Sequence, residues 1–240
     1  IGNMLLERSQ HFGYLETLLQ QHYPDHELTV RNLGWPADTA TLQPRPDNFA
    51  DTEQHLFHER ADVILVAFGF NESFRGGGGL LGFTAATGNY IAKLQSLAFN
   101  GKGSPRIVVL SPIANEDIEG VKASKNNPSI KMYADALQTL AEDLQVGYVD
   151  LFEPTARAMK SPGNDLTING VHLNDAGYQF VSDIIFRTLT AEDPPAPRED
   201  IRRVVIDKNR QYFRRFRPLN TFITPVGGAR RTATWTFFRR

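Results

Sequence analysis

The stretch Asp62-Val-Ile-Leu-Val-Ala-Phe-Gly69 decides the fold. Its six central residues are all apolar, and a charged residue and a glycine bound them. A strand that is apolar on both faces is expected in a parallel sheet that helices cover on both sides. We therefore predict a buried parallel strand at this point of the chain.

Segments on both sides of this stretch continue the pattern. Apolar or alternating runs predict further strands at 26–33, 106–112 and 146–152. Helical spacing of apolar residues predicts helices at 5–23, 48–60, 83–98, 130–144 and 177–189. Strands that alternate with helices form right-handed βαβ units. The predicted fold is therefore an α/β one, a doubly wound parallel sheet in a three-layer α/β/α sandwich.

A further strand should precede the first helix, and Ile1-Gly2 has the character of its last residues. Because that strand would be central, we expect the chain to be poorly stable unless further residues precede Ile1. Four glycines at 76–79 predict a mobile loop, and the polar segment 113–128 predicts a long loop at the rim of a site. We expect a domain at 1–190, then a proline-containing linker and a C-terminal arm at 191–240 with little periodicity.

Composition narrows the class of protein. Hydrophobic residues make up 41% and charged residues 22%, as in ordinary globular proteins. No stretch approaches the roughly 18 apolar residues that cross a bilayer, so no membrane partner is expected. The chain has no cysteine, which excludes disulfides, cysteine nucleophiles and thiolate metal sites. Residues 198–240 carry 12 Lys and Arg against 3 Asp and Glu, which leaves 14 against 24 in the acidic remainder.

The loop Asp165-Leu-Thr-Ile-Asn-Gly-Val-His-Leu-Asn-Asp175 presents a single histidine, His172, with Asn169 three residues before it. A helix is predicted directly after this loop. A loop histidine that is anchored to a following helix suits a general base, because it is held rigidly and stays open to solvent.

Other polar residues follow the predicted strands. In open parallel sheets, ligands bind at the carboxyl ends of the strands. The residues placed there are Gly2-Asn3-Met4, Gly34, Gly69 to Ser73, Ser111 and the His172 loop. Glycine backbone amides and asparagine amides can donate to a developing oxyanion, which favours acyl transfer over phosphate binding. No P-loop spacing occurs, and no nucleotide cofactor is expected.

These blocks resemble those of the SGNH, or GDSL-type, hydrolase superfamily over roughly residues 1–190. Its first block, Gly-Asp-Ser, matches Gly2-Asn3-Met4, and its second-block glycine matches Gly34. Its third block, Gly-x-Asn-Asp, matches Gly69-Phe70-Asn71-Glu72, and its last block, Asp-x-x-His, matches Asn169-Gly170-Val171-His172. The resemblance implies a flavodoxin-like fold and ester hydrolysis through a covalent acyl-enzyme, often on acylated carbohydrates, with no metal or cofactor. It assigns Asn3, Met4, Gly34 and Asn71 to oxyanion stabilisation and substrate binding.

Two residues depart from the superfamily pattern. Methionine at position 4 cannot attack an ester carbonyl, and asparagine at 169 carries no charge to stabilise an imidazolium. Three alternatives would restore activity: Ser73 as a displaced nucleophile, Glu72 with His172 activating a water, or Asp165 or Asp175 as the partner of His172. The function predicted is an ester hydrolase, with a non-catalytic carbohydrate- or ligand-binding module on the same fold as the alternative.

The chain also resembles a subgroup of these domains in large secreted bacterial proteins, through Gly2-Asn3, the helix motif Gln10 to Glu16, and the arm segment from Lys208 to Asn220. Arginine and aromatic residues alternate at 202–217, as they do in nucleic-acid binders, but the acidic body favours docking of the arm on its own domain. His55 and His58 stand three residues apart without a carboxylate cluster, so no metal site is predicted.

Overall fold

A computed structural model describes residues 1–46, 49–161, 163 and 165–216. The larger helices are α2 (Tyr14–His22), α3 (Thr52–Glu59), α5 (Gly77–Gln95), α6 (Asn127–Asp143), α8 (Asp175–Thr190) and α9 (Glu199–Phe216). Short helices are α1 (Met4–Ser9), α4 (Phe70–Ser73), α7 (Phe152–Ala158) and the 3-10 turn η1 (Ala123–Asn126). The strands are β1 (Val63–Val66), β2 (Arg106–Leu110), β3 (Asp117–Ile118), β4 (Val121–Lys122) and β5 (Gly147–Val149).

The main sheet is parallel and has the order β1-β2-β5. Ile1 and Gly2 extend it beyond β1, as predicted: Gly2 forms a parallel bridge with Ala67, and the Ile1 amino group donates to the Leu65 carbonyl at 2.8 Å. The sheet therefore ends with the backbone of residues 1–3 beside the carboxyl end of β1. This places Asn3 and Met4 at the edge where parallel sheets bind ligands.

The predicted strand at 26–33 is wrong, because none of its residues adopts strand pairing. The backbone reaches the sheet only afterwards, where the Trp35 amide donates to the Gly2 carbonyl at 2.9 Å. An alternating sequence forms a strand only when a neighbouring strand accepts and donates its backbone hydrogen bonds. The backbone beside this segment is that of Ile1 and Gly2, which is two residues long.

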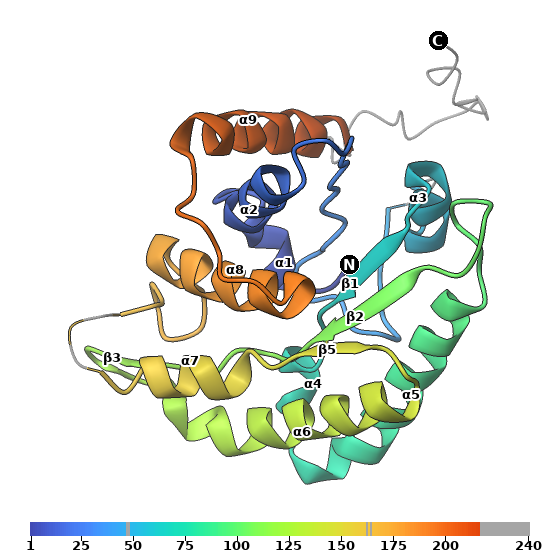
Figure 1. The fold of residues 1–240 in the computed structure, drawn as a ribbon. Coiled ribbons are helices and arrows are strands. Elements are labelled where there is room, and N and C mark those ends of the chain that lie inside the picture. The colour runs from blue at the N-terminus through green and yellow to red at the C-terminus, as the bar shows by residue number, and fades with distance from the viewer. Residues whose placement is uncertain (47–48, 162, 164, 217–240) are drawn as a thin grey trace, which may run out of the picture.

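Apolar side chains on the two faces of the sheet form two separate cores. Ile64 and Val66 of β1 point to one face and Leu65 and Ala67 to the other, which is the period of two that a strand imposes. The first core packs against α5 and α6, and the second against α2 and α8 (Figure 1). The predicted three-layer sandwich is confirmed.

The single helix predicted at 5–23 is divided into α1 and α2. Gly13 separates them with a left-handed φ of +70°, a conformation that glycine adopts without strain. A Cβ at this position would lie 3.1 Å from side-chain carbons of Val205 and Ile206. Glycine at 13 thus allows both the turn and the close approach of α9.

The glycines at 76–79 do not form the predicted mobile loop, because three of them open α5. The Tyr133 hydroxyl donates to the Gly76 carbonyl at 2.9 Å. A Cβ on Gly79 would lie 2.5 Å from the Tyr133 hydroxyl oxygen. The glycines therefore let the first turn of α5 approach α6. In the predicted long loop at 113–128, the chain forms the hairpin β3–β4 and η1.

The arm is more regular than its sequence suggested, since residues 199–216 form α9. This helix lies along α2 (Figure 1), with Val205 buried and Lys208 Nζ 2.7 Å from the Glu16 carboxylate. Arg202 lies over the Tyr14 ring at 4.6 Å, and the Tyr14 hydroxyl donates to Asp175 at 2.7 Å. The rest of the arm, 217–240, is outside the described residues. Among the residues described, no helix is both long and apolar enough to cross a membrane.

Candidate active site

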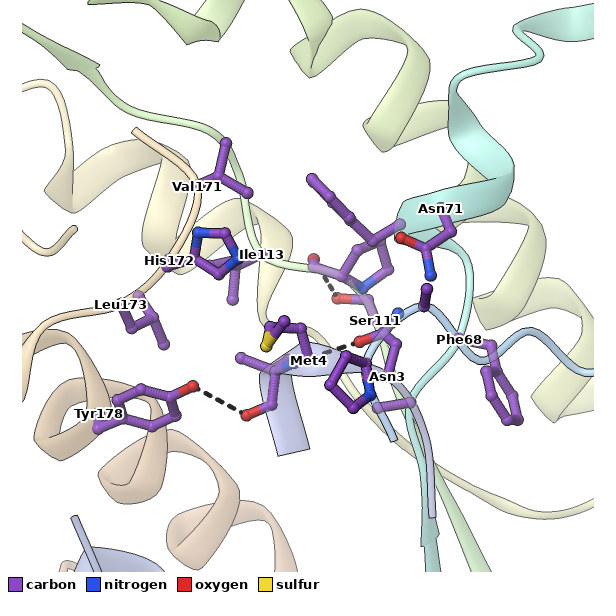
Figure 2. Close-up of a pocket in the computed structure, with 16 residues that line it drawn as sticks. Asn3, Met4, Phe68, Asn71, Ser111, Ile113, Val171, His172, Leu173 and Tyr178 are labelled. Atoms are coloured by element: carbon purple, nitrogen blue, oxygen red, sulfur yellow. Dashed lines mark hydrogen bonds between the residues drawn. The ribbon is translucent and has the colours of Figure 1, made fainter. Parts of the chain in front are cut away.

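A pocket of about 240 Å³ opens at the carboxyl ends of β1 and β2 (Figure 2). Its polar lining residues are Asn3, Asn71, Ser111, His172 and Tyr178. Apolar side chains supply most of the remaining wall, among them Met4, Phe68, Ile113, Val171 and Leu173. Mostly apolar walls with a few convergent polar groups are typical of small-molecule sites.

The start of α1 brings Asn3 and Met4 to this pocket. Gly2 approaches the Ala67 carbonyl so closely that a Cβ would lie 2.5 Å from its oxygen. Asn3 then caps α1, with its Oδ1 accepting from the Leu5 amide at 3.2 Å. The cap turns Met4 inward, and Figure 2 shows its side chain between His172 on one side and Asn3 and Asn71 on the other.

The loop that carries His172 is fixed by a buried carboxylate. Glu116 is 2% exposed and accepts hydrogen bonds from the Leu166 amide at 3.0 Å, the Thr167 amide at 2.8 Å and the Thr167 hydroxyl at 2.6 Å. The Glu116 amide also donates to the Gly170 carbonyl at 2.8 Å. Glu116 was not predicted from the sequence, although a charged side chain two residues after Ile113-Ala114 was a signal.

Asn169 sets the orientation of the His172 ring. Its Oδ1 accepts from the His172 amide at 2.9 Å and from the Val171 amide at 3.2 Å, which fixes which end of the side-chain amide is oxygen. The Nδ2 group then lies 2.9 Å from His172 Nδ1, while Oδ1 lies 3.1 Å from it. Nδ1 either accepts from Nδ2, with the ring proton on Nε2, or donates to Oδ1, with the lone pair on Nε2.

The protonation of His172 follows from its surroundings. Burial lowers the pKa of the imidazole below its ordinary value, and the nearby positive charge of Arg8 lowers it further. The neutral ring therefore predominates near pH 7. Since Nδ1 is directed to Asn169, Nε2 is the ring nitrogen that remains for the pocket.

A model of the GDSL-like lipase/acylhydrolase family matches residues 8–180 of this sequence. The chain belongs to that family. The match covers most of the α/β sandwich and includes the blocks Gly69-Phe70-Asn71-Glu72 and Asn169-Gly170-Val171-His172. No curated protein matches the sequence.

Solved structures of similar fold include esterases. Axe2, an acetylxylan esterase from Geobacillus stearothermophilus, is 18% identical with a TM-score of 0.62, and the match covers 81% of this chain and 94% of Axe2. Alanine replaces a serine, an aspartate or a histidine in forms of Axe2 described as catalytic mutants. A gut microbial diltiazem-metabolizing enzyme is 17% identical with a TM-score of 0.58, and the match covers 78% of this chain and 45% of that one.

The hydroxyl groups that line the pocket of this family member are already engaged. Ser111 is fully buried, and its Oγ accepts from the Leu151 and Phe152 amides at 2.8 and 3.1 Å and donates to the Pro112 carbonyl. The Tyr178 hydroxyl donates to the Leu5 carbonyl at 3.0 Å, and burial raises its pKa. Neither oxygen is poised to attack an ester.

Two of the sequence-predicted residues lie outside the pocket. Ser73 is 1% exposed, and its hydroxyl donates to the Phe70 carbonyl at 2.7 Å. Glu72 accepts from the Gly69 amide at 3.0 Å as a cap of α4, and it lines a different cavity with Arg75 and Thr87. The structure thus brings neither of them to His172.

The other proposed partners also have different contacts. Asp175 accepts from Tyr14, and the Asp165 carbonyl accepts from Asn174, so Asn169 is the residue that contacts the His172 ring. The Gly34 amide donates to Asn32 Oδ1 at 3.0 Å, and Gly34 does not line the pocket. The described residues contain no group of three His, Asp or Glu side chains that could hold a metal ion.

Proposed function

We propose that this domain binds an acylated ligand, such as an O-acetylated carbohydrate, without forming an acyl-enzyme. The observation that carries the proposal is the position of Met4. A thioether occupies the place between His172 and the asparagines where the family pattern has its serine. The pocket keeps hydrogen-bond donors and an apolar wall, but it has no nucleophile that His172 could activate.

The comparisons support the ligand class. Axe2 is described as acting on acetylxylan, and its mutated aspartate and histidine are three residues apart. In this chain Asn169 and His172 have that spacing. The neutral amide keeps the histidine in place but stabilises an imidazolium less than a carboxylate would.

Direct hydrolysis of an ester by water is the second candidate function. Its favouring observation is the lowered pKa of His172, which leaves the ring unprotonated near pH 7. A base on this side of the ring requires a lone pair on Nε2, which the ring has when Nδ1 donates to Asn169 Oδ1, 3.1 Å away. This candidate therefore requires the tautomer whose proton lies on Nδ1.

Calorimetric titration with monoacetylated xylobiose and with plain xylobiose tests the binding proposal. We expect at least 10-fold tighter binding of the acetylated sugar. We also expect hydrolysis of p-nitrophenyl acetate no faster than by His172→Ala. Met4→Phe should fill the pocket and weaken binding, whereas Met132→Phe, at an exposed position of α6, should not. Equal affinity for the two sugars would contradict the proposal, and hydrolysis that His172→Ala abolishes would favour the second candidate.

We further propose that α9 serves the domain as an intramolecular partner of α2 and does not bind nucleic acid. Burial raises the pKa of Glu16 and lowers that of Lys208, and the attraction between them opposes both shifts. Asn209 adds a hydrogen bond to the Gln10 carbonyl at 3.4 Å. Lys208 and Asn209 make these two contacts from the same face of α9 as the buried Val205.

Lys208→Met tests this role of the arm. The variant leaves the Glu16 carboxylate buried without its cation, and we expect the free energy of unfolding to fall by about 2 kcal/mol. Arg210→Met removes an exposed charge from the same helix and should change it by less than about 0.5 kcal/mol. Urea denaturation at pH 7 measures both. Equal stability of the two variants would show that the contact contributes nothing to the fold.

A further inference from the structure

A second cavity, of about 370 Å³, lies along one side of α5. The residues of α5 that line it are Gly78, Gly79, Gly82, Phe83, Ala86 and Thr87. At a rise of 1.5 Å per residue, this stretch of helix is about 13 Å long. The remaining lining residues are Ala40, Thr41, Glu72 and Arg75. Both the volume and the mixture of polar and apolar walls suit a small-molecule site.

Glu72 and Arg75 lie against this side of α5. A Cβ built on Gly79 would lie 2.6 Å from Arg75 Cβ, so the stem of the arginine packs on the helix backbone. The Gly69 amide donates to Glu72 Oε2 at 3.0 Å, and a Cβ built on Gly69 would lie 3.3 Å from Phe83 Cζ. The two charged side chains therefore border the cavity beside the face of α5 that carries Gly79 and Phe83.

Two oxygen atoms of the lining are buried and have no hydrogen-bond partner among the described residues. They are Thr87 Oγ1, on a side chain that is 0% exposed, and Glu72 Oε1. Burial raises the pKa of the Glu72 carboxyl, and the backbone amides of residues 72, 69 and 40 oppose the rise. Buried polar atoms are nearly always paired, so a cavity that borders two unpaired oxygens suits a ligand with hydrogen-bond donors.

Two glycines leave the cavity open along α5. A Cβ built on Gly78 or Gly82 would have no atom within 4 Å. Glycine inside a helix is less stable than alanine, and packing does not require it at position 82. A side chain at either position would take up space beside the cavity. The glycines thus let a ligand approach the helix backbone.

The charges of the lining cancel. Glu72 and Arg75 are its charged residues, and the positive charge of Arg75 acts on the Glu72 carboxyl. A ligand with a full charge of either sign would be attracted by one of them and repelled by the other. A hydroxyl group can donate to a carboxylate and can accept from a guanidinium. A neutral molecule with several hydroxyl groups therefore suits both residues.

We infer that this cavity is a second binding site, which takes a neutral sugar through its hydroxyl groups. Glu72 is the acceptor for the sugar, Arg75 is a donor, and Thr87 is the partner closest to the core. None of these residues lines the pocket that contains Met4. The second site requires no acyl group on the sugar, so the inference does not rest on the proposed function.

Methyl NMR during a titration with plain xylobiose tests the inference. We expect the methyl resonances of Ala86 and Thr87 to shift, with a dissociation constant in the millimolar range. The methyl resonance of Met4 reports on the first pocket and should stay in place at the same sugar concentrations. A shift at Met4 without one at Thr87 would place the sugar in the first pocket and overturn the inference.

Three variants show whether the cavity itself binds the sugar. Gly82→Leu fills the open space and should weaken binding about 10-fold or more. Ala85→Leu adds the same side chain at an exposed position of α5 that does not line the cavity, and it should bind as the native chain does. Equal binding by these two variants would contradict the inference.

Thr87→Val separates a binding role from a structural one. The variant keeps the shape of the side chain and should weaken sugar binding about 5-fold, with the Ala86 methyl as the readout. The midpoint of urea unfolding should not fall, because the hydroxyl has no partner to lose. A lower midpoint with unchanged binding would assign the hydroxyl to the fold and overturn its role in the site.

Charged sugars test the neutrality of the site. Glucuronate and glucosamine add a carboxylate or an ammonium to the ring of glucose, and each should bind no more tightly than glucose. Tighter binding of either would overturn the choice of a neutral ligand. No shift at Thr87 with any sugar would show that the cavity holds water alone. If acetylated and plain xylobiose both shift Thr87 and not Met4, the proposed function fails and this inference stands; if acetylated xylobiose shifts only Met4, the reverse holds.

Discussion

The double variant Met4→Ser/Asn169→Asp should hydrolyse p-nitrophenyl acetate about 10³-fold faster than the native chain. Serine at position 4 places a hydroxyl at the point that Met4 occupies between His172 and the asparagines. Aspartate at 169 accepts from His172 Nδ1, which keeps the ring proton on Nδ1. The lone pair on Nε2 can then take the serine proton. The donors that would stabilise the oxyanion, Asn3 and Asn71, are already in place.

The two substitutions should act as a unit. Met4→Ser alone lacks the carboxylate that stabilises the imidazolium, and Asn169→Asp alone supplies a base without a nucleophile. Members of a catalytic triad are grossly non-additive, so each single variant should stay within about 10-fold of the native rate. Burst kinetics with p-nitrophenyl acetate would detect the acyl-enzyme that only the double variant can form.

His172→Ala in the double variant is the control, and it should return the rate to that of the native chain. Nitrogen-15 spectra show whether the ring proton lies on Nδ1 in the double variant. A folded double variant with its proton on Nδ1 and no gain in rate would show that Asn3 and Asn71 are not aligned on a tetrahedral intermediate. The pocket would then be shaped for binding alone.

Replacement of Glu116 by alanine should lower the free energy of unfolding by about 3 kcal/mol. The carboxylate accepts from two backbone amides and one hydroxyl of residues 166–167, and all three donors are buried. A buried donor that loses its acceptor costs about 1–3 kcal/mol, and partial relaxation of the loop limits the sum. Glu119→Ala, in the exposed turn of the same hairpin, should cost less than about 0.5 kcal/mol.

Histidine NMR distinguishes a positioning role from a purely structural one. In Glu116→Ala the loop loses its anchor at Leu166 and Thr167, so the His172 ring resonances should broaden while those of distant His58 stay sharp. Glu116→Gln keeps the shape and one acceptor, and it should restore part of the stability. A loss below about 1 kcal/mol, with unchanged His172 resonances, would show that the Thr167–Leu173 bridge is enough to hold the loop.

The sequence predicted the sheet well where its residues are buried on both faces. The runs 62–69 and 106–112 need no particular partner to be recognised as buried strands, because their composition alone excludes a solvent-facing side. The same logic placed Asn3, Asn71 and His172 at one edge, since the carboxyl ends of parallel strands converge there. All three residues line the pocket.

The misses share one physical cause, which is that they depend on contacts between distant segments. The segment 26–33 has strand composition but lacks a ladder partner. The glycines at 77–79 open a helix in the structure, and Gly79 leaves the space that the Tyr133 hydroxyl occupies. Glu116 anchors a loop that lies 50 residues later in the chain. No local pattern reveals which side chain contacts a histidine ring, so the contact between Asn169 and His172 also needed the structure.

The series of contacts from Arg202 to Tyr14 and on to Asp175 bears on how shorter versions of this protein should be designed. Asp175 opens the helix that directly follows the His172 loop, and Tyr14 opens α2, the helix after the one that begins at Met4. A protein that ends at residue 190 would lack Arg202, which covers the Tyr14 ring beside the start of α8. A recombinant version that extends to residue 216 keeps the contacts among Arg202, Tyr14 and Asp175.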